Sequence, residues 1–173
     1  DRVRKVSTRA DLANLAPLAD GEVVLVSKFS TNSDWGSLRS FVYEEGSNLQ
    51  TVAGCVEDYG SGQWIAPDCF SGDPINVRWF GASDSPSLAV TSHSQIQAAI
   101  DFVTSRTNSS GNRVGGTVKI PAGIYAISTS IVLRPRLNLI GENSHYSDQN
   151  YVTASVTNTS YAAGGSVQFV LLG

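Results

Sequence analysis

The second half of the chain is built from short apolar segments that no tight hairpin turn joins. From residue 115 onward these segments are only a few residues long and alternate with bends. An antiparallel meander would need primed turns, which favour dipeptides such as Asn-Gly. Short strands separated by bends indicate instead a coiled solenoid, in which each turn of the chain stacks on the one before it. The segments that we expect to be strands are 116–121, 124–127, 131–133, 137–141, 152–157 and 166–172.

An amphipathic helix over residues 92–106 is expected just before these strands. Ser92 and Gln95 have the spacing of a Ser-x-x-Gln capping box at its start. Apolar side chains then recur at helical spacing on a single face. Such a face must cover other apolar groups, so we expect the helix to cap the first turn of the solenoid. The face consists of Ile96, Ala99, Ile100 and Val103.

The first half of the chain predicts a small α+β module. A short helix is expected over residues 7–15, with Thr8 as its N-cap and Asp11 at the capping-box position. Residues 22–29 are rich in valine, which is typical of a central strand that buries both faces. Residues 30–37 are polar and predict a loop. Further strands are expected at 38–44, 49–56 and 63–65.

The composition excludes several classes of protein and of partner. The 173 residues are 41% hydrophobic and 16% charged, with a net charge of -3. This apolar content excludes intrinsic disorder, and no apolar run approaches the roughly 20 residues that a membrane span needs. Twelve basic residues without a cluster argue against nucleic acid as a partner.

The few cysteines and histidines predict neither a disulfide framework nor a metal site. Cys55 and Cys69 could form one bridge, but a reduced structural pair is the expectation that we favour. His93 and His145 lie at no ligand spacing from each other or from a cysteine. We therefore expect no metal and no cofactor.

The two ends of the sequence suggest a segment of a longer polypeptide. The chain begins with Asp1 and has no secretory leader at this end, and it closes on an apolar stretch that is typical of a strand within a sheet. A bare apolar strand would leave its edge and faces in water. We therefore expect the solenoid to continue beyond Gly173 in the parent protein.

Four blocks of sequence, in order, carry a resemblance to a known family. They are Asn76-Val-Arg-Trp-Phe-Gly-Ala82, Ile96-Gln-Ala-Ala-Ile-Asp101, Gly115-Gly-Thr-Val-Lys-Ile-Pro-Ala-Gly-Ile-Tyr125 and Leu137-Asn-Leu-Ile-Gly-Glu142. This order resembles the opening of the pectate-lyase-like right-handed parallel β-helix of bacteriophage tailspike proteins. In the looser first half, Asp11-Leu12, Ala19-Asp-Gly-Glu-Val23 and Gly62-Gln-Trp64 resemble the small module that precedes that β-helix. One departure is clear, because only Asp84 remains of the acidic Gly-Asp-Gly-x-x-Asp-Asp-Thr segment of the family.

The resemblance implies a fold that is mainly β and has two parts. Residues 1–75 would be a small α+β connector module, and residues 76–173 a capping helix with the first rungs of a right-handed parallel β-helix. It further implies a homotrimer at the virion tail, in contact with other tail or baseplate proteins, with apolar and aromatic surface at its interface. The partner implied for the downstream β-helix is host capsular polysaccharide or lipopolysaccharide, which it would bind and often degrade.

The resemblance places the catalytic residues of the family on later rungs, so we assign no catalytic residue here and leave enzymatic activity open. Two alternatives remain. One is a carbohydrate-active enzyme, either a polysaccharide lyase or a glycoside hydrolase, with its site in or beside this segment. The other is a non-viral β-helix adhesin or secreted enzyme.

A polar stretch after the segment 137–141 contains the candidate residues for polysaccharide contact. Acidic, imidazole and aromatic side chains gather there, and aromatic rings can stack on sugars. The alternative interpretation is a solvated loop between rungs. The candidates are Glu142, His145, Tyr146, Asp148 and Tyr151.

Overall fold

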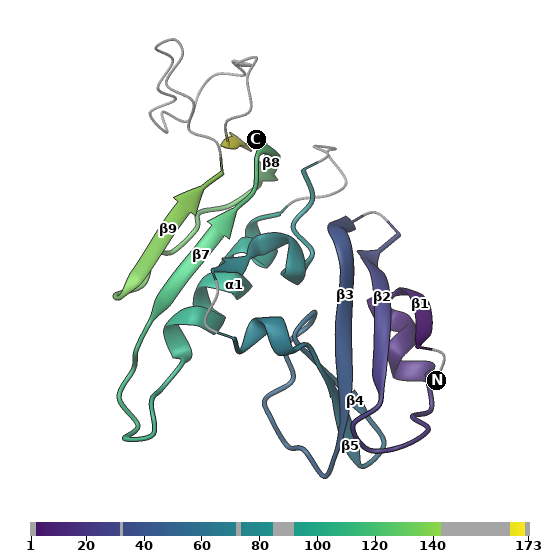
Figure 1. Ribbon diagram of the computed structural model, residues 1–173. Helices are drawn as coiled ribbons and strands as arrows, with labels where there is room; N and C mark the ends of the chain where they lie inside the picture. The colour runs from purple at the N-terminus through teal and green to yellow at the C-terminus, as the bar shows by residue number, and fades with distance from the viewer. Residues whose placement is uncertain (1–2, 32, 72–73, 85–91, 143–166, 172–173) are drawn as a thin grey trace.

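A computed structural model of the chain describes residues 3–31, 33–71, 74–84, 92–142 and 167–171. The first half of the chain forms a five-stranded sheet. Figure 1 shows this sheet on one side of the molecule and the parallel strands β7 (Gly116–Ile120) and β9 (Leu137–Gly141) on the other, with helix α1 (His93–Ser105) between them. The described chain is mainly β, with one α-helix and three short 3-10 helices. None of the helices in this described part is long and apolar enough to cross a bilayer.

The five-stranded sheet has the order β1-β2-β3-β5-β4. β1 and β2 pair in parallel, whereas the other neighbours are antiparallel. The valine-rich segment is central, as predicted, since β2 lies between β1 and β3. The strands are β1 (Arg4–Thr8), β2 (Val23–Ser30), β3 (Ser33–Glu45), β4 (Val56–Tyr59) and β5 (Gly62–Ile65).

The predicted helix near the start is a short 3-10 helix, η1 (Arg9–Asn14). The expected capping contact is confirmed, because the Thr8 amide donates to Asp11 Oδ2 at 2.7 Å. Leu12 is the side chain of this helix that is buried in the core. Two further 3-10 turns follow later in the chain, η2 (Pro67–Cys69) and η3 (Val77–Phe80).

Three sequence expectations for strands and loops were wrong. The polar loop expected at 30–37 is mostly strand, because β3 already begins at Ser33 and continues the antiparallel pairing with β2. The strand expected at 49–56 is a loop with one isolated bridge between Val52 and Val56. The strand expected at 131–133 does not form. β1 and β4 were not predicted.

Helix α1 (His93–Ser105) ends within a residue of its predicted limits. Its apolar face is completely buried, as the helical spacing predicts, and it packs against β6, β7 and η3. The predicted capping box is wrong: the Ser92 hydroxyl bonds the backbone N and O of Ser83, each at 3.0 Å. The Ser92 hydroxyl therefore bonds the backbone of another segment and does not cap the helix, contrary to what the sequence predicts.

The strands of the second half pair in parallel, as a solenoid requires. One sheet has the order β6-β7-β9, and a second pair consists of β8 and β10. β9 occupies the predicted range, whereas the strand expected at 152–157 lies outside the described residues, which contain no closed β-helix. The elements are β6 (Ile75–Asn76), β7 (Gly116–Ile120), β8 (Gly123–Ile127), β9 (Leu137–Gly141) and β10 (Val167–Leu171).

Candidate functional site

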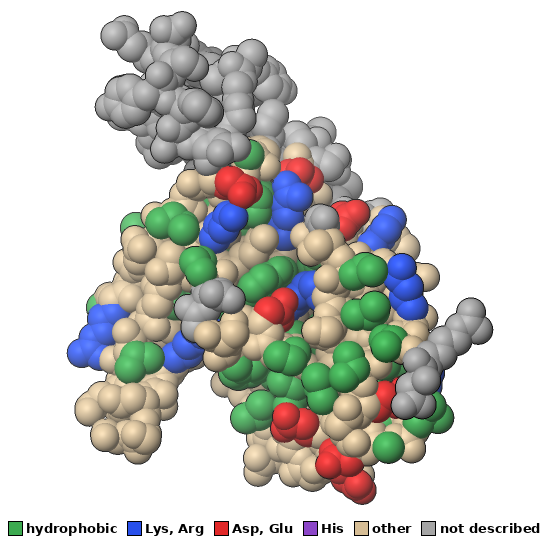
Figure 2. All heavy atoms as spheres, viewed as in Figure 1, with side chains coloured by type: hydrophobic (Ala, Val, Ile, Leu, Met, Phe, Trp, Pro, Cys, Tyr) green, Lys and Arg blue, Asp and Glu red, His purple; other side chains and the backbone are tan. Residues whose placement is uncertain are grey.

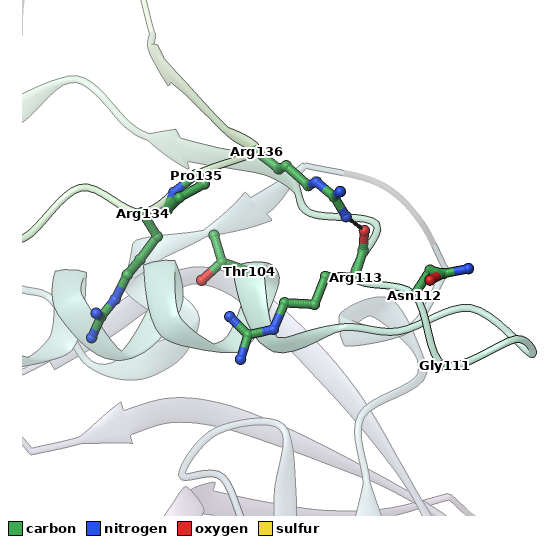
Figure 3. A pocket seen from close by; sticks show the side chains of 7 residues that line it. All are labelled: Thr104, Gly111, Asn112, Arg113, Arg134, Pro135 and Arg136. Carbon is green, nitrogen blue, oxygen red and sulfur yellow. Dashed lines mark hydrogen bonds between the residues drawn. The ribbon is translucent and has the colours of Figure 1, made fainter.

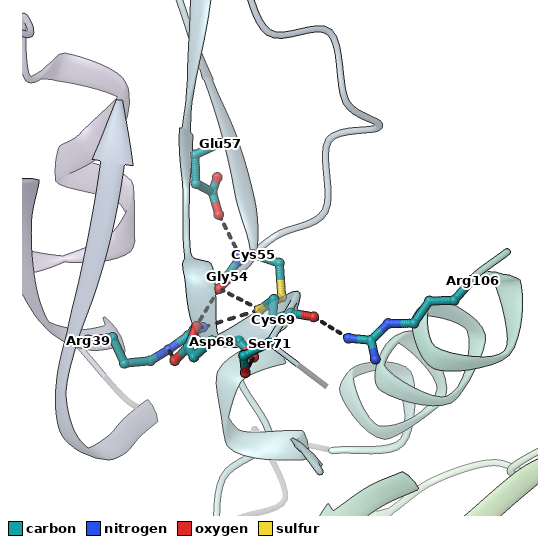
Figure 4. A network of polar contacts seen from close by, with 8 residues as sticks. All are labelled: Arg39, Gly54, Cys55, Glu57, Asp68, Cys69, Ser71 and Arg106. Carbon is teal, nitrogen blue, oxygen red and sulfur yellow. Dashed lines mark hydrogen bonds and ion pairs between the residues drawn. A yellow bond between two sulfur atoms is a disulfide. The ribbon is translucent and has the colours of Figure 1, made fainter. Parts of the chain in front are cut away.

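The junction between the five-stranded sheet and the parallel strands is organised around Arg39, an inward-facing residue of β3. Its side chain is only 2% exposed. The guanidinium donates to both carboxylate oxygens of Asp68, at 2.8 and 2.5 Å, and to the Gly54 carbonyl at 2.6 Å. Figure 4 shows these contacts converging at one point. A buried guanidinium needs such partners, because an unpaired charge in the interior is strongly destabilising.

Aromatic rings from both parts of the chain surround the same guanidinium. Arg39 Cζ lies 4.9 Å from the ring centre of Trp35 and 4.6 Å from that of Trp79. Trp35 comes from β3, whereas Trp79 belongs to η3, which packs on α1. Cations over aromatic faces are attracted by the ring quadrupole, and more strongly when water is excluded. Arg39 therefore ties the sheet to the element that leads into the parallel strands.

A disulfide between Cys55 and Cys69 reinforces this junction, which corrects the expectation of a reduced pair. The sharp bend at Gly54 and the turn of η2 bring the two Cα atoms to 5.8 Å, within the range that a disulfide spans. Arg106, at the end of α1, donates to the Cys69 carbonyl. A bridge that closes a loop of this size contributes about 3 kcal/mol in the chain-entropy model.

Gly54 fits at the junction because it has no side chain. Its φ of +86° lies in the left-handed region, and an added Cβ would come within 1.8 Å of the Trp79 carbonyl oxygen. Only glycine allows this backbone approach without strain. The upstream loop and η3 are thus packed backbone against backbone.

Glu57 is a buried acid beside the disulfide. Its Oε1 accepts from the Gly54 amide at 2.6 Å, and its Oε2 accepts from Arg9 at 2.7 Å. Desolvation by burial raises the pKa of Glu57 above its ordinary value, although both hydrogen bonds oppose the shift. Folding therefore favours the protonated acid.

We expect this buried acid to make the protein less stable as the pH rises. Because the folded-state pKa is the higher one, its stabilising contribution is complete below the ordinary pKa near 4.5 and is lost as pH rises through the folded value. Glu57→Gln removes this dependence while it keeps an acceptor for Gly54. Urea denaturation of both proteins between about pH 4 and 8 should show the variant gaining relative stability as pH rises. A difference that is constant with pH would contradict the raised pKa.

A second polar cluster lies where β7 and β9 end. Lys119 Nζ contacts Glu142 Oε1 at 2.8 Å, and the Glu142 amide donates to the Ile120 carbonyl. The hydrogen bond from Lys119 is the main reason that the pKa of Glu142 is lowered. Glu142 is therefore ionised at neutral pH, which suits binding a hydroxyl or a cation and not proton donation.

Close to this cluster, Tyr125 is fully buried and Arg78 bridges several groups. Arg78 contacts Asp84 at 2.5 Å and the Ala122 carbonyl at 3.2 Å, and its Nε lies 3.5 Å from the Tyr125 hydroxyl. The Tyr125 hydroxyl donates to the Pro121 carbonyl at 3.0 Å, and burial raises the pKa of Tyr125. A phenol held this way is a structural donor. Asp84 therefore holds Arg78 in place through this ion pair.

Of the five predicted polysaccharide contacts, the structure describes only Glu142, which it places at the end of β9. His145, Tyr146, Asp148 and Tyr151 lie outside the described residues. The described residues contain no group of three or more His, Cys, Asp or Glu side chains that could hold a metal ion. Sequence reasoning missed the Arg39 junction, whose one visible signal is an arginine within the apolar stretch 38–44.

Comparison with known proteins identifies the fold. No family model and no curated protein matches the chain. The tailspike protein of Acinetobacter phage vB_ApiP_P1 superposes with a TM-score of 0.59 at 19% identity, over 82% of this chain and 23% of that one. The tailspike of Acinetobacter phage vb_AbaP_AS12 gives 0.56 at 19% identity, over 82% and 22%.

A third similar structure is Pantoea stewartii WceF, described as a glycan biofilm modifying enzyme with a bacteriophage tailspike-like parallel β-helix fold. It gives a TM-score of 0.53 at 16% identity, over 82% of this chain and 22% of that one. The chain thus spans less than a quarter of each of these three proteins. Its fold is tailspike-like, as the sequence blocks predicted.

Proposed function

We propose that the chain is the connector and the first rungs of a homotrimeric phage tailspike, at the virion tail. Residues 1–75 would face other tail or baseplate proteins, and residues 76–173 would begin the right-handed parallel β-helix. The continuation of that β-helix would bind host capsular polysaccharide or lipopolysaccharide and degrade it. The observation that supports this proposal most directly is the parallel stacking of β6, β7 and β9 on a rigid junction to an upstream sheet.

The pairing register supports a chain that coils around one axis. Gly116 pairs with Leu137, 21 positions later, so one turn of the solenoid takes 21 residues at this face. Gly123 pairs with Val167, 44 positions later, so the turns of the coil differ in length.

The surface of β9 supports continuation of the coil. Leu139 and Ile140 point to opposite faces of this strand, yet they are 40% and 36% exposed. Among the described strands, β9 pairs only with β7. A further rung along the free edge would pair the backbone and cover both side chains.

The outward face of the five-stranded sheet supports association with further copies of the chain. Along β2 and β3 the inward residues are buried, whereas Val23 and Leu38 on the other face are 41% and 47% exposed. Val42, the cross-strand partner of Val23, widens this apolar face. Figure 2 shows hydrophobic side chains gathered over the area of β2 and β3. Apolar sheet faces of this kind are typical of interfaces in homo-oligomers.

Light scattering coupled to size exclusion tests the oligomeric part of the proposal. We expect three times the protomer mass of 18.3 kDa at concentrations of about 100 μM. Leu38→Glu buries a charge in the proposed interface, so it should shift the mass to that of one protomer. Leu18→Glu is the matched control, because Leu18 is 78% exposed and lies outside the strands. A protomer-sized wild type that Leu38→Glu leaves unchanged would contradict this interface.

A further inference from the structure

A basic pocket lies at the end of β9 opposite to Glu142. Its cavity of about 410 Å³ is bounded by the end of α1, the loop at 111–113 and the segment that leads into β9. This volume falls within the range of about 300–1,000 Å³ that is typical of small-molecule sites. Figure 3 shows Arg113 extending from the loop toward Thr104 of α1. The lining residues are Thr104, Gly111, Asn112, Arg113, Arg134, Pro135 and Arg136.

The coil itself brings the arginines together. Arg134 follows Arg113 by 21 positions, the step that separates the paired residues Gly116 and Leu137. Stacking one turn on the next therefore places the two side chains on one wall of the molecule. Arg136 adds a third guanidinium from the upper turn.

The charge of the pocket is only partly compensated. Arg134 pairs with Asp101 at 2.9 Å, and Arg136 donates to the backbone carbonyl of Arg113. The Arg113 guanidinium forms no hydrogen bond or ion pair with any described residue. None of the described residues that line the cavity is acidic. Three guanidiniums with one neighbouring carboxylate leave a net positive field, which attracts anions.

Capping of α1 does not account for Arg113. The hydroxyls of Thr104 and Ser105 already donate to carbonyls of the last turns, at 2.8 and 2.9 Å. The Arg106 carbonyl accepts from the Val114 amide at 3.0 Å, and the Arg106 side chain reaches Cys69. The helix end thus has donors from other residues, and the Arg113 side chain stays available for a ligand.

The backbone beneath the pocket is held in an uncommon conformation. Arg136 has a φ of 65°, in the left-handed region that non-glycine residues rarely adopt. Gly115 packs so closely below it that an added Cβ would lie 2.2 Å from the Arg136 carbonyl oxygen. Strained backbone persists where the surroundings over-determine it, and such positions cluster at functional sites.

We propose that this pocket binds an oxyanion, namely a carboxylate or phosphate group carried by a polar ligand. The Arg113 and Arg134 guanidiniums would hold the anion, since their planar donor forks match carboxylate and phosphate oxygens. The site is independent of the connector role, which rests on the sheet and on the junction.

An NMR titration of the whole chain tests the site with three probes: sodium glucuronate, inorganic phosphate and glucose. We expect both anions to shift the amides of Gly111, Asn112 and Arg113, and glucose to leave them unchanged. Raising NaCl from 0.05 to about 0.5 M should weaken the anion binding, because the guanidiniums are exposed to screening. The tighter anion identifies the group that the pocket binds as a carboxylate or as a phosphate.

Arg113→Gln should weaken binding of the tighter anion by about tenfold, the loss expected for one charged hydrogen bond. Lys5→Gln is the matched control: it removes an exposed cation from β1, and binding should not change. Thermal melting of both variants verifies the fold. Equal binding of glucose and glucuronate, or anion binding that survives Arg113→Gln, would overturn the proposal. Neither result would change the oligomeric mass that tests the connector proposal.

Discussion

Asp68→Asn is expected to lower the free energy of unfolding by about 3 kcal/mol, near the lower end of the range for breaking a buried ion pair. The substitution keeps the shape of the side chain but removes the charge that balances Arg39. The guanidinium cannot move into water, since its side chain is 2% exposed. We place the loss at the lower end because the Asp68 side chain is 35% exposed. Urea denaturation near neutral pH measures the loss.

Asp101→Asn serves as the matched control for this ion pair. Asp101 contacts Arg134 at a similar distance, 2.9 Å, but both side chains are about half exposed. Exposed pairs contribute less than about 1 kcal/mol, so the control should change stability little. Combining Asp68→Asn with Arg39→Met should cost less than the sum of the single changes, because no buried charge remains unpaired. Equal losses in Asp68→Asn and Asp101→Asn would contradict a buried pair at the junction.

Ile100→Ala is expected to cost between about 2 and 5 kcal/mol, the range for truncating a buried isoleucine. Ile100 is completely buried on the face of α1 that packs against β6, β7 and η3. The smaller side chain leaves a cavity between the helix and these elements. Hydrogen exchange should locate the loss, with faster exchange of the β7 amides than of those in β2.

Ser94→Ala is the control for this helix. Ser94 lies on its exposed face, and its hydroxyl contacts only the neighbouring Gln95 among the described side chains. A surface change of this kind stays within about 0.5 kcal/mol. If Ile100→Ala were equally mild, α1 would not hold β7 in place.

The elements that could be predicted from the sequence are those whose own hydrophobic pattern determines their type and limits. The spacing of Ile96, Ala99, Ile100 and Val103 defines the buried face of α1, and the segment 137–141 forms β9 within its predicted limits. In both cases local periodicity and tertiary burial agree. Such agreement is what makes a sequence informative about its fold.

Elements that depend on distant partners could not be predicted. Residues 33–37 look like a loop because they are polar, yet Trp35 turns inward and the backbone pairs with β2. The apolar stretch 49–56 looks like a strand, but the Gln63 amide holds Leu49 through two hydrogen bonds at 2.8 Å. A side chain from another strand therefore provides the partners that a sheet ladder would have supplied.

The candidate sites show the same division. Glu142 could be placed after β9 because the strand itself is evident, whereas nothing in a single sequence shows that Asp68 meets Arg39 or that Cys55 meets Cys69. The members of these pairs are 29 and 14 positions apart in the sequence, and they meet through bends whose directions cannot be predicted from the sequence. The proximity of Arg113 and Arg134 could be predicted only after the structure had given the length of one turn, because the two residues lie 21 positions apart.

The parallel register at β7 and β9 makes this architecture extensible in one direction. β6 is followed at once by η3 and the Arg39 junction, so that side of the stack is occupied. The edge of β9 is the one along which more chain can be added, and each added unit advances the axis by about 4.8 Å. Duplicating a 21-residue unit there would lengthen the stack of parallel strands by one turn, while the Arg39 junction stayed the same. The length of the stack and the stability of the junction can therefore change independently.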